Sequence, residues 1–145
     1  SHGPDIHAAP SLNTLLEQVK ESLRDANTAA ANAGAALKSC DLVLGVVDEC
    51  VPAGDPKHVA ITAKADNRRG DALLLLGRAE DALNAFDAAA KLTPDDGYII
   101  YNRGRALLAL DRNDEAKAAF TLAAGEKFKR SGVRKLAAEA LAGMK

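Results

Sequence analysis

Tryptophan is absent from this sequence, and aromatic residues make up only 3% of its 145 positions. Hydrophobic residues nevertheless account for 48%, and a large share of them is alanine. Alanine loses no side-chain entropy in a helix and lets backbones approach closely, whereas strands favour aromatic and β-branched residues. The composition therefore favours an all-helical fold, in a chain whose length suits a single domain.

A strong charge of one sign is also missing, because the formal net charge is −1. Such a chain has no overall field that would attract nucleic acid or an anionic membrane. Long apolar runs are lacking as well, since the run at residues 42–47 is far shorter than the roughly 20 residues that cross a bilayer. We expect neither nucleic-acid binding nor a membrane span.

Cysteine is scarce, with Cys40 and Cys50 only. Both fall in one predicted helix, where a rise of about 1.5 Å per residue separates them by roughly 15 Å. A disulfide needs Cα atoms within about 7 Å, so we expect no bridge between them and no indication of the compartment. We expect Cys40 to be buried and structural, and Cys50 to lie near a helix end without a basic neighbour that would activate its thiol.

The sequence does contain an internal repeat with a step of 34 residues. So many identities in register indicate a true duplication. The first copy contributes Arg69, Gly70, Ala72, Leu73, Leu74, Leu76, Arg78, Ala82, Ala85, Phe86, Ala89 and Ala90, and the second contributes Arg103, Gly104, Ala106, Leu107, Leu108, Leu110, Arg112, Ala116, Ala119, Phe120, Ala123 and Ala124.

Each copy has the apolar spacing of two helices. The first stripe has a glycine followed by leucines, and the second has alanines around a phenylalanine, at i, i+3 and i+4 spacing. Turns separate the stripes at residues 76–79 and 110–113. The first copy closes at residues 93–96, where Pro94 stops a helix and an aspartate can cap the next one.

These residues resemble the tetratricopeptide repeat over residues 63–130. That family has a small residue where paired helices meet, glycine at the turn, an Ala–aromatic–Ala pattern in the second helix, and a closing proline. The matching positions here are Gly70, Gly104, Gly77, Ala82, Phe86, Ala89 and Pro94. The second copy departs from the pattern with Asp111 at the turn and Phe128 at the close, and the first lacks the usual aromatic residue early in its first helix. The resemblance implies an all-α fold, a right-handed α-α superhelix of about three helical hairpins plus a C-terminal capping helix.

The predicted domain covers residues 11–145, with repeats at 63–96 and 97–130 and a capping helix at 131–145. A shift of 42 makes residues 21–54 a degenerate repeat, whose first helix extends back towards Ser11 as its N-cap. This shift overlays Cys40, Leu44, Val47 and Pro52 on Ala82, Phe86, Ala89 and Pro94. Residues 53–56 are an inserted loop, so the next helix is expected to begin near Pro56. The apolar positions of the capping helix are Val133, Leu136, Ala137 and Leu141. Residues 1–10 lack an initiator methionine and are expected to be a tag-like or disordered N-terminus.

By the same resemblance, the first helices of successive repeats line a concave groove that holds a peptide or helix of a partner protein. Asparagine suits a peptide backbone, arginine a carboxylate, and tyrosine adds apolar area with a polar tip. The groove positions are Lys64, Asn67, Arg68, Asp71, Tyr98, Tyr101, Asn102, Arg105, Arg134 and Lys135. Since Asp71 is the single acid among them, we predict an electropositive groove and an acidic ligand segment or C-terminus. The family's clamp for a C-terminal carboxylate is incomplete, because only Asn102 stands at a clamp position, so a chaperone-type tail is not predicted.

No pattern in the sequence indicates catalysis. His58 falls in the inserted loop without a cysteine or carboxylate at ligand spacing, so a solvated side chain is expected. Acidic pairs such as Glu80 and Asp81 open second helices, where the positive helix end favours them. We expect no enzyme activity, no cofactor and no metal.

Two kinds of function remain open. The chain is either an adaptor that docks a protein or peptide in the groove, or a structural module that self-associates through its aliphatic N-terminal repeat or an end of the stack. The Ala-rich sequence is similar to bacterial tetratricopeptide proteins, some of them exported. This similarity favours a cell-envelope or periplasmic location, with the cytoplasm as the alternative.

Overall fold

The computed structural model describes residues 11–25, 28–129 and 131–144. Within these residues the protein is helical, without a strand. The predicted N-terminal segment 1–10, which contains His2 and His7, lies outside the described residues. The elements are α2 (Leu12–Ser22), α3 (Ala29–Cys50), α4 (Pro56–Leu75), α5 (Ala79–Leu92), α6 (Gly97–Ala109), α7 (Asn113–Ala123), the 3-10 helix η1 (Glu126–Phe128) and α8 (Val133–Gly143).

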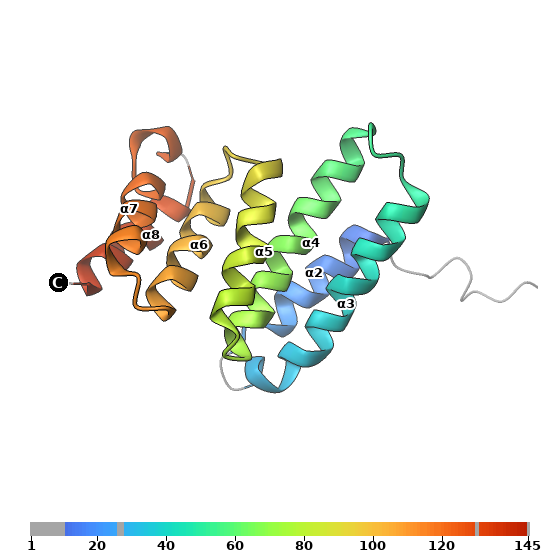
Figure 1. Ribbon diagram of the computed structural model, residues 1–145, viewed down its shortest axis with the longest axis horizontal. Coiled ribbons are helices and arrows are strands. Elements are labelled where there is room, and N and C mark those ends of the chain that lie inside the picture. Colours follow the sequence, from blue (N-terminus) through green and yellow to red (C-terminus); the bar gives the residue numbers. More distant parts are fainter. Residues whose placement is uncertain (1–10, 26–27, 130, 145) are drawn as a thin grey trace, which may run out of the picture.

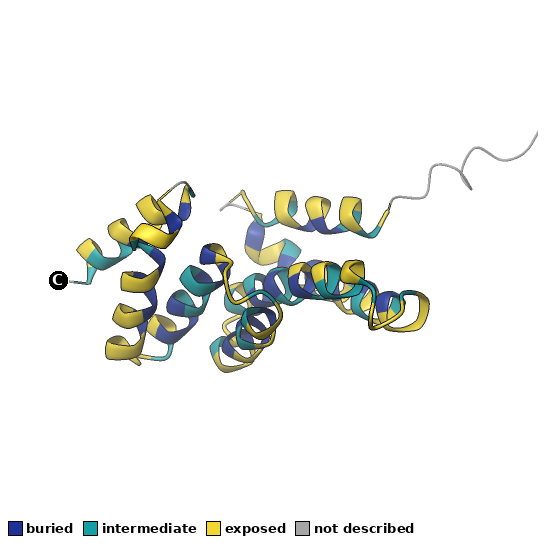
Figure 2. Ribbon diagram, turned by 90° about the horizontal axis from the view of Figure 1, so that it is seen from above, coloured by how far each residue is buried: buried dark blue, intermediate teal, exposed yellow. Residues whose placement is uncertain are grey.

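The helices form antiparallel pairs that stack along the long axis of the molecule (Figure 1). Helix α2 pairs with α3, α4 with α5, and α6 with α7, while α8 packs on α7 and α6 at the C-terminal end. Buried residues lie where neighbouring helices face each other, and exposed residues lie on the outer faces (Figure 2). The predicted stack of helical hairpins with a final helix is confirmed.

Polar side chains cap three of the helices where the sequence predicts a helix start. Ser11 Oγ accepts from the Thr14 backbone N–H at 3.1 Å, and an Asp55 oxygen accepts from Lys57 at 2.9 Å. Asp96 accepts from Tyr98 at 2.9 Å and so begins α6. Each cap satisfies a backbone donor that the helix leaves unpaired.

The turn between the two helices of each copy requires a left-handed residue. Gly77 has φ +76° and Asp111 has φ +58°. Glycine adopts this region freely, and a short polar residue tolerates it better than other side chains. Asp111 therefore keeps the turn, although the family pattern has glycine at this position.

A glycine and a phenylalanine meet inside each of the two clear hairpins. A Cβ atom on Gly70 would stand 2.6 Å from Cδ1 of Phe86, and one on Gly104 would stand 2.6 Å from Cε1 of Phe120. Both phenylalanine rings are fully buried in the same core cluster. The expectation that small residues let the paired helices touch is confirmed, and the two rings have matching surroundings.

The first hairpin is formed by α2 and α3. Helix α2 begins after its N-cap Ser11, where the first helix was expected to start, but it already ends at Ser22, near the start of the predicted repeat at 21–54. The reason is the length of α3, whose 22 residues move the turn between the helices upstream. Cys40 and Val47 are buried as their counterparts Ala82 and Ala89 are, whereas Leu44 is only partly buried.

Helix α3 is more apolar than the short run at residues 42–47 indicates. By length and composition alone it could cross a membrane, with a mean hydropathy of 1.3. In this structure one face of α3, with Cys40, Val43 and Val47, packs in the core against α2 and α4, whereas 28% of its apolar window is buried in all. Burial raises the pKa of the Cys40 thiol to about 12, and nearby Asp41 adds to this shift, so the thiol stays protonated and inert. Cys50 is exposed at the end of the same helix.

An ion pair and a second polar contact join α3 to α4. Arg69 donates to Asp41 at 2.8 Å, and His58 Nε2 lies 3.2 Å from Asp48 Oδ1. The expectation of a solvated loop histidine is wrong, because α4 begins at Pro56 and places His58 in its first turn, where its side chain is only 19% exposed.

Asp66 on the same helix gives the fold a pH dependence. Burial raises the pKa of its carboxyl to about 6, and Asp48 adds to this shift while Arg69 opposes it. A carboxyl whose pKa is raised by folding stabilises the folded state while it is protonated. This contribution is complete below about pH 4 and is lost as the pH rises to about 6. We predict that Asp66→Asn gains stability relative to the wild type over that interval, by on the order of 1 kcal/mol after allowance for solvent screening. Urea unfolding of both proteins at pH 4 and pH 7.5 measures the change, and an equal difference at the two pH values would contradict it.

Candidate functional site

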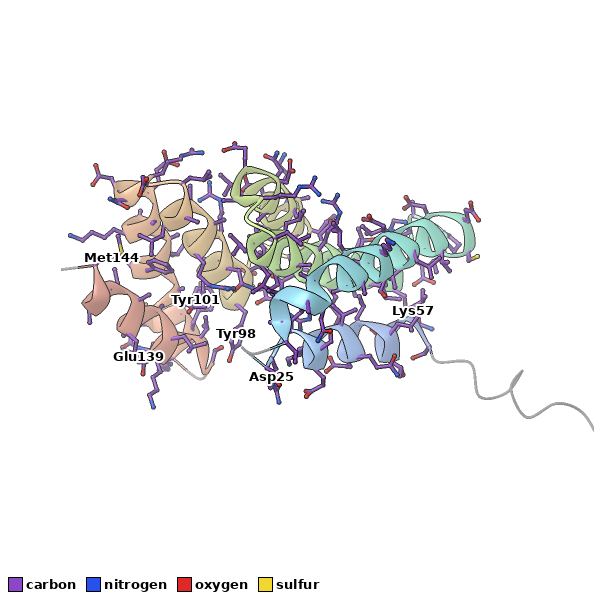
Figure 3. The ribbon with its side chains drawn as sticks, turned by 90° about the horizontal axis from the view of Figure 1, so that it is seen from below. Asp25, Lys57, Tyr98, Tyr101, Glu139 and Met144 are labelled. Atoms are coloured by element: carbon purple, nitrogen blue, oxygen red, sulfur yellow. The ribbon has the colours of Figure 1, made fainter. Side chains whose placement is uncertain are left out.

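A cavity of about 820 Å³ opens along the first helices of the three hairpins. Its walls come from α2, α4, α6 and one residue of α8. Figure 3 shows Tyr98 and Tyr101 of α6 on the side of the molecule on which α2 and α8 lie. Eight of the ten predicted groove residues line it, namely Lys64, Asn67, Arg68, Asp71, Tyr98, Tyr101, Asn102 and Arg105. We call this cavity the groove.

The two residues predicted on the capping helix do not line the groove. Arg134 donates to the Ala124 carbonyl at 3.1 Å and pairs with Glu126 at 3.2 Å, which ties α8 to the segment before it. Lys135 is exposed elsewhere on α8. Leu136 lines the groove instead and is 39% exposed, although the sequence pattern assigns it to the buried face. Adjacent residues are about 100° apart around a helix, so an error of one residue in the register of α8 exchanges these side chains.

Sequence reasoning missed the contribution of α2. Lys20 lies in its last turn, and Leu23 and Arg24 follow it directly, and all three line the groove. The spacing of Lys20 and Arg24, four residues apart, places them on one helix face and could have revealed them. They were missed because the groove positions were taken only from the two clear copies of the repeat and from the capping helix.

Two buried asparagines join α4 to α6 at the floor of the groove. Asn102 Nδ2 donates to Asn67 Oδ1 at 2.9 Å, and each residue is only 7% exposed. Arg105 in turn donates to Asn102 Oδ1 at 3.0 Å. The Asn67 oxygen and the Asn102 amide that were predicted for a ligand backbone therefore already bind within the protein. Among the described residues, Asn67 Nδ2 has no hydrogen-bond partner and remains available as a donor.

Asp71 lies between two arginines of the groove. Arg105 donates to Asp71 Oδ1 at 3.0 Å, and Arg68 lies 3.9 Å from Asp71 Oδ2. Burial raises the pKa of the Asp71 carboxyl, whereas Arg105 and Arg68 act in the opposite direction. The carboxylate fixes both guanidinium groups and offsets part of their charge.

The side chains that line the groove carry an excess of positive charge. Five are basic and two are acidic, an excess of three. The acidic Asp96 caps α6 through the Tyr98 and Ile99 backbone amides, so its carboxylate already accepts two hydrogen bonds. The basic side chains are Lys20, Arg24, Lys64, Arg68 and Arg105.

The residues that the structure describes contain no cluster of three or more histidine, cysteine, aspartate or glutamate side chains that could hold a metal ion. Comparison with protein families gives a match to the tetratricopeptide repeat at residues 63–96 and 98–128. A search of curated proteins finds no match.

Proposed function

We propose that this chain, which is a tetratricopeptide repeat protein, binds an acidic segment of a partner protein in its groove. Tetratricopeptide repeats are non-catalytic units that mediate protein–protein interaction or scaffolding. The family establishes this general role, and the chemistry of the groove supplies the character of the partner.

The excess of basic side chains in the groove is the observation that carries the proposal. Lys20 and Lys64 are exposed, and within the part of the chain that the structure describes the Lys64 ammonium makes one polar contact, with Asn13 Oδ1 at 3.3 Å. Asp71 cannot neutralise both Arg68 and Arg105, since it carries one charge against two. Carboxylates of a ligand would complete these pairs with charge-assisted hydrogen bonds.

The two tyrosines add an apolar component to the groove. Tyr101 packs on Phe120 with ring centroids 5.6 Å apart, which fixes the orientation of its ring. Tyr98 is 43% exposed and Leu136 faces the same cavity, so apolar surface is available beside the basic side chains. Tyrosine gives contact area with little loss of conformational entropy. The favoured ligand is therefore a segment with an apolar or aromatic residue flanked by aspartate or glutamate.

Selection from a library of random peptides tests this proposal without knowledge of the natural partner. The wild-type chain is immobilised and the bound peptides are sequenced. We expect enrichment of segments in which acidic residues flank an apolar residue, and we expect their binding to weaken as salt rises. Enrichment of basic or purely apolar peptides would contradict the proposal.

A further inference from the structure

The outer face of α3 has a repeating pattern that the groove does not use. Its exposed residues include Ala31, Ala35, Lys38, Leu42, Gly45 and Glu49. They follow one another at alternating steps of four and three, the spacing of a seam between two packed helices. Leu42 at its centre is 61% exposed. Helix α3 packs mainly on α4 and α2 and lies at the edge of the stack (Figure 1).

The equivalent face of α5 is polar. The shift of 42 places Glu80, Asn84, Asp87 and Lys91 of α5 on Lys38, Leu42, Gly45 and Glu49 of α3. A second helix that faces water in this protein thus carries an amide and a carboxylate where α3 carries leucine and glycine. The apolar centre of the α3 face is specific to α3.

The charges on this face are also unpaired within residues 11–25, 28–129 and 131–144. The neighbouring acids of α3 are engaged, since Asp41 pairs with Arg69 and Asp48 with His58. Among the described residues, Lys38 and Glu49 make no ion pair and no side-chain hydrogen bond. They have opposite signs and flank the central pair Leu42 and Gly45 on either side.

We propose that the outer face of α3 binds the same face of a second copy of this chain, with the two α3 helices antiparallel about a two-fold axis between residues 43 and 44. This axis places Leu42 of each copy over Gly45 of the other. It also places Lys38 of each copy opposite Glu49 of the other, which gives two ion pairs. An added Cβ at Gly45 would meet nothing within 4 Å, so the space that receives Leu42 is open. A two-fold interface must be self-complementary, and this arrangement satisfies that requirement in both apolar packing and charge. The surface is separate from the groove, so both can act together.

Sedimentation velocity over a concentration series tests the proposal. We expect a reversible dimer of the wild type, and a dissociation constant raised at least about tenfold by Leu42→Asn or Gly45→Asp, which copy the residues of α5. Both positions are exposed, so circular dichroism should show an unchanged fold. The control Asn84→Leu on α5 should leave the dimer unchanged.

Charge exchange tests the orientation. Lys38→Glu alone places two glutamates together at each end of the seam, and Glu49→Lys alone places two lysines there. We expect either variant to weaken the dimer, and the double variant Lys38→Glu with Glu49→Lys to restore it. A monomeric wild type, a dimer that Leu42→Asn leaves intact, or a double variant that stays weakened would each overturn the proposal. A wild type that remains monomeric but sediments with lipid vesicles would assign the α3 face to a membrane instead.

Discussion

Replacing Gly70 by alanine is expected to destabilise the protein by about 3 kcal/mol. The added methyl group would stand 2.6 Å from Cδ1 of Phe86, which is closer than two non-bonded carbon atoms can approach. The Phe86 ring is fully buried and cannot swing into solvent, so α4 and α5 must separate and leave poorly packed space around it. Gly104→Ala should have a similar effect through Phe120. Urea or thermal unfolding measures both changes.

Gly34 provides the matched control for this substitution. It lies inside α3, and an added Cβ there would meet nothing within 4 Å. Alanine restricts the unfolded chain and favours the helix, so Gly34→Ala should stabilise the protein by roughly 0.5–1 kcal/mol. The same chemical change thus has opposite signs at the two positions. Equal effects would show that close contact between the paired helices is not what requires glycine.

Reversing two charges in the groove is expected to weaken an acidic ligand on the order of 100-fold. The variant combines Lys20→Glu and Lys64→Glu, which changes the charge of the lining side chains from an excess of three positive to one negative. Both lysines are exposed, so the fold should be unaffected. Fluorescence anisotropy with a labelled acidic peptide taken from the library selection measures the loss of affinity.

The control for charge reversal uses lysines outside the groove. Lys91 on α5 and Lys117 on α7 are exposed and do not line the groove. Lys91→Glu with Lys117→Glu makes the same change in net charge, and we expect less than about a threefold loss of affinity, from long-range electrostatics only. Equal losses in the two double variants would mean that net charge, rather than the groove, attracts the peptide.

The repeated part of the fold could be predicted from sequence because its contacts are local and periodic. Gly70 and Phe86 are sixteen positions apart, and the same pair recurs 34 residues later at Gly104 and Phe120. Two copies of one pattern specify the register of the helices and the turn between them. For this reason the predicted positions on α4 and α6 lie together along one cavity, and their role in binding stays a prediction.

The parts outside the duplication were harder to predict because tertiary packing determines their register. Lys20 and Arg24 at the end of α2 also line the groove, but the groove positions were taken only from the two clear copies and the capping helix. On α8, Leu136 lines the groove instead of the predicted Lys135, because packing sets the rotation of this helix about its axis. The hydrogen bond between Asn67 and Asn102 depends on how closely α4 and α6 approach, which no pattern within one helix reports.

Nuclear magnetic resonance with an ¹⁵N-labelled chain tests the central claim, that an acidic segment binds in the groove. The side-chain amides of Asn67 and Asn102 lie at the floor of the groove, and each gives a distinct pair of signals. On titration with an acidic peptide from the library selection, we expect these amides and the backbone amides of Lys20, Lys64 and Tyr98 to shift together and saturate at one peptide per chain. Shifts confined to α5, α7 or the outer face of α3, with the Asn67 and Asn102 amides unmoved, would contradict the claim.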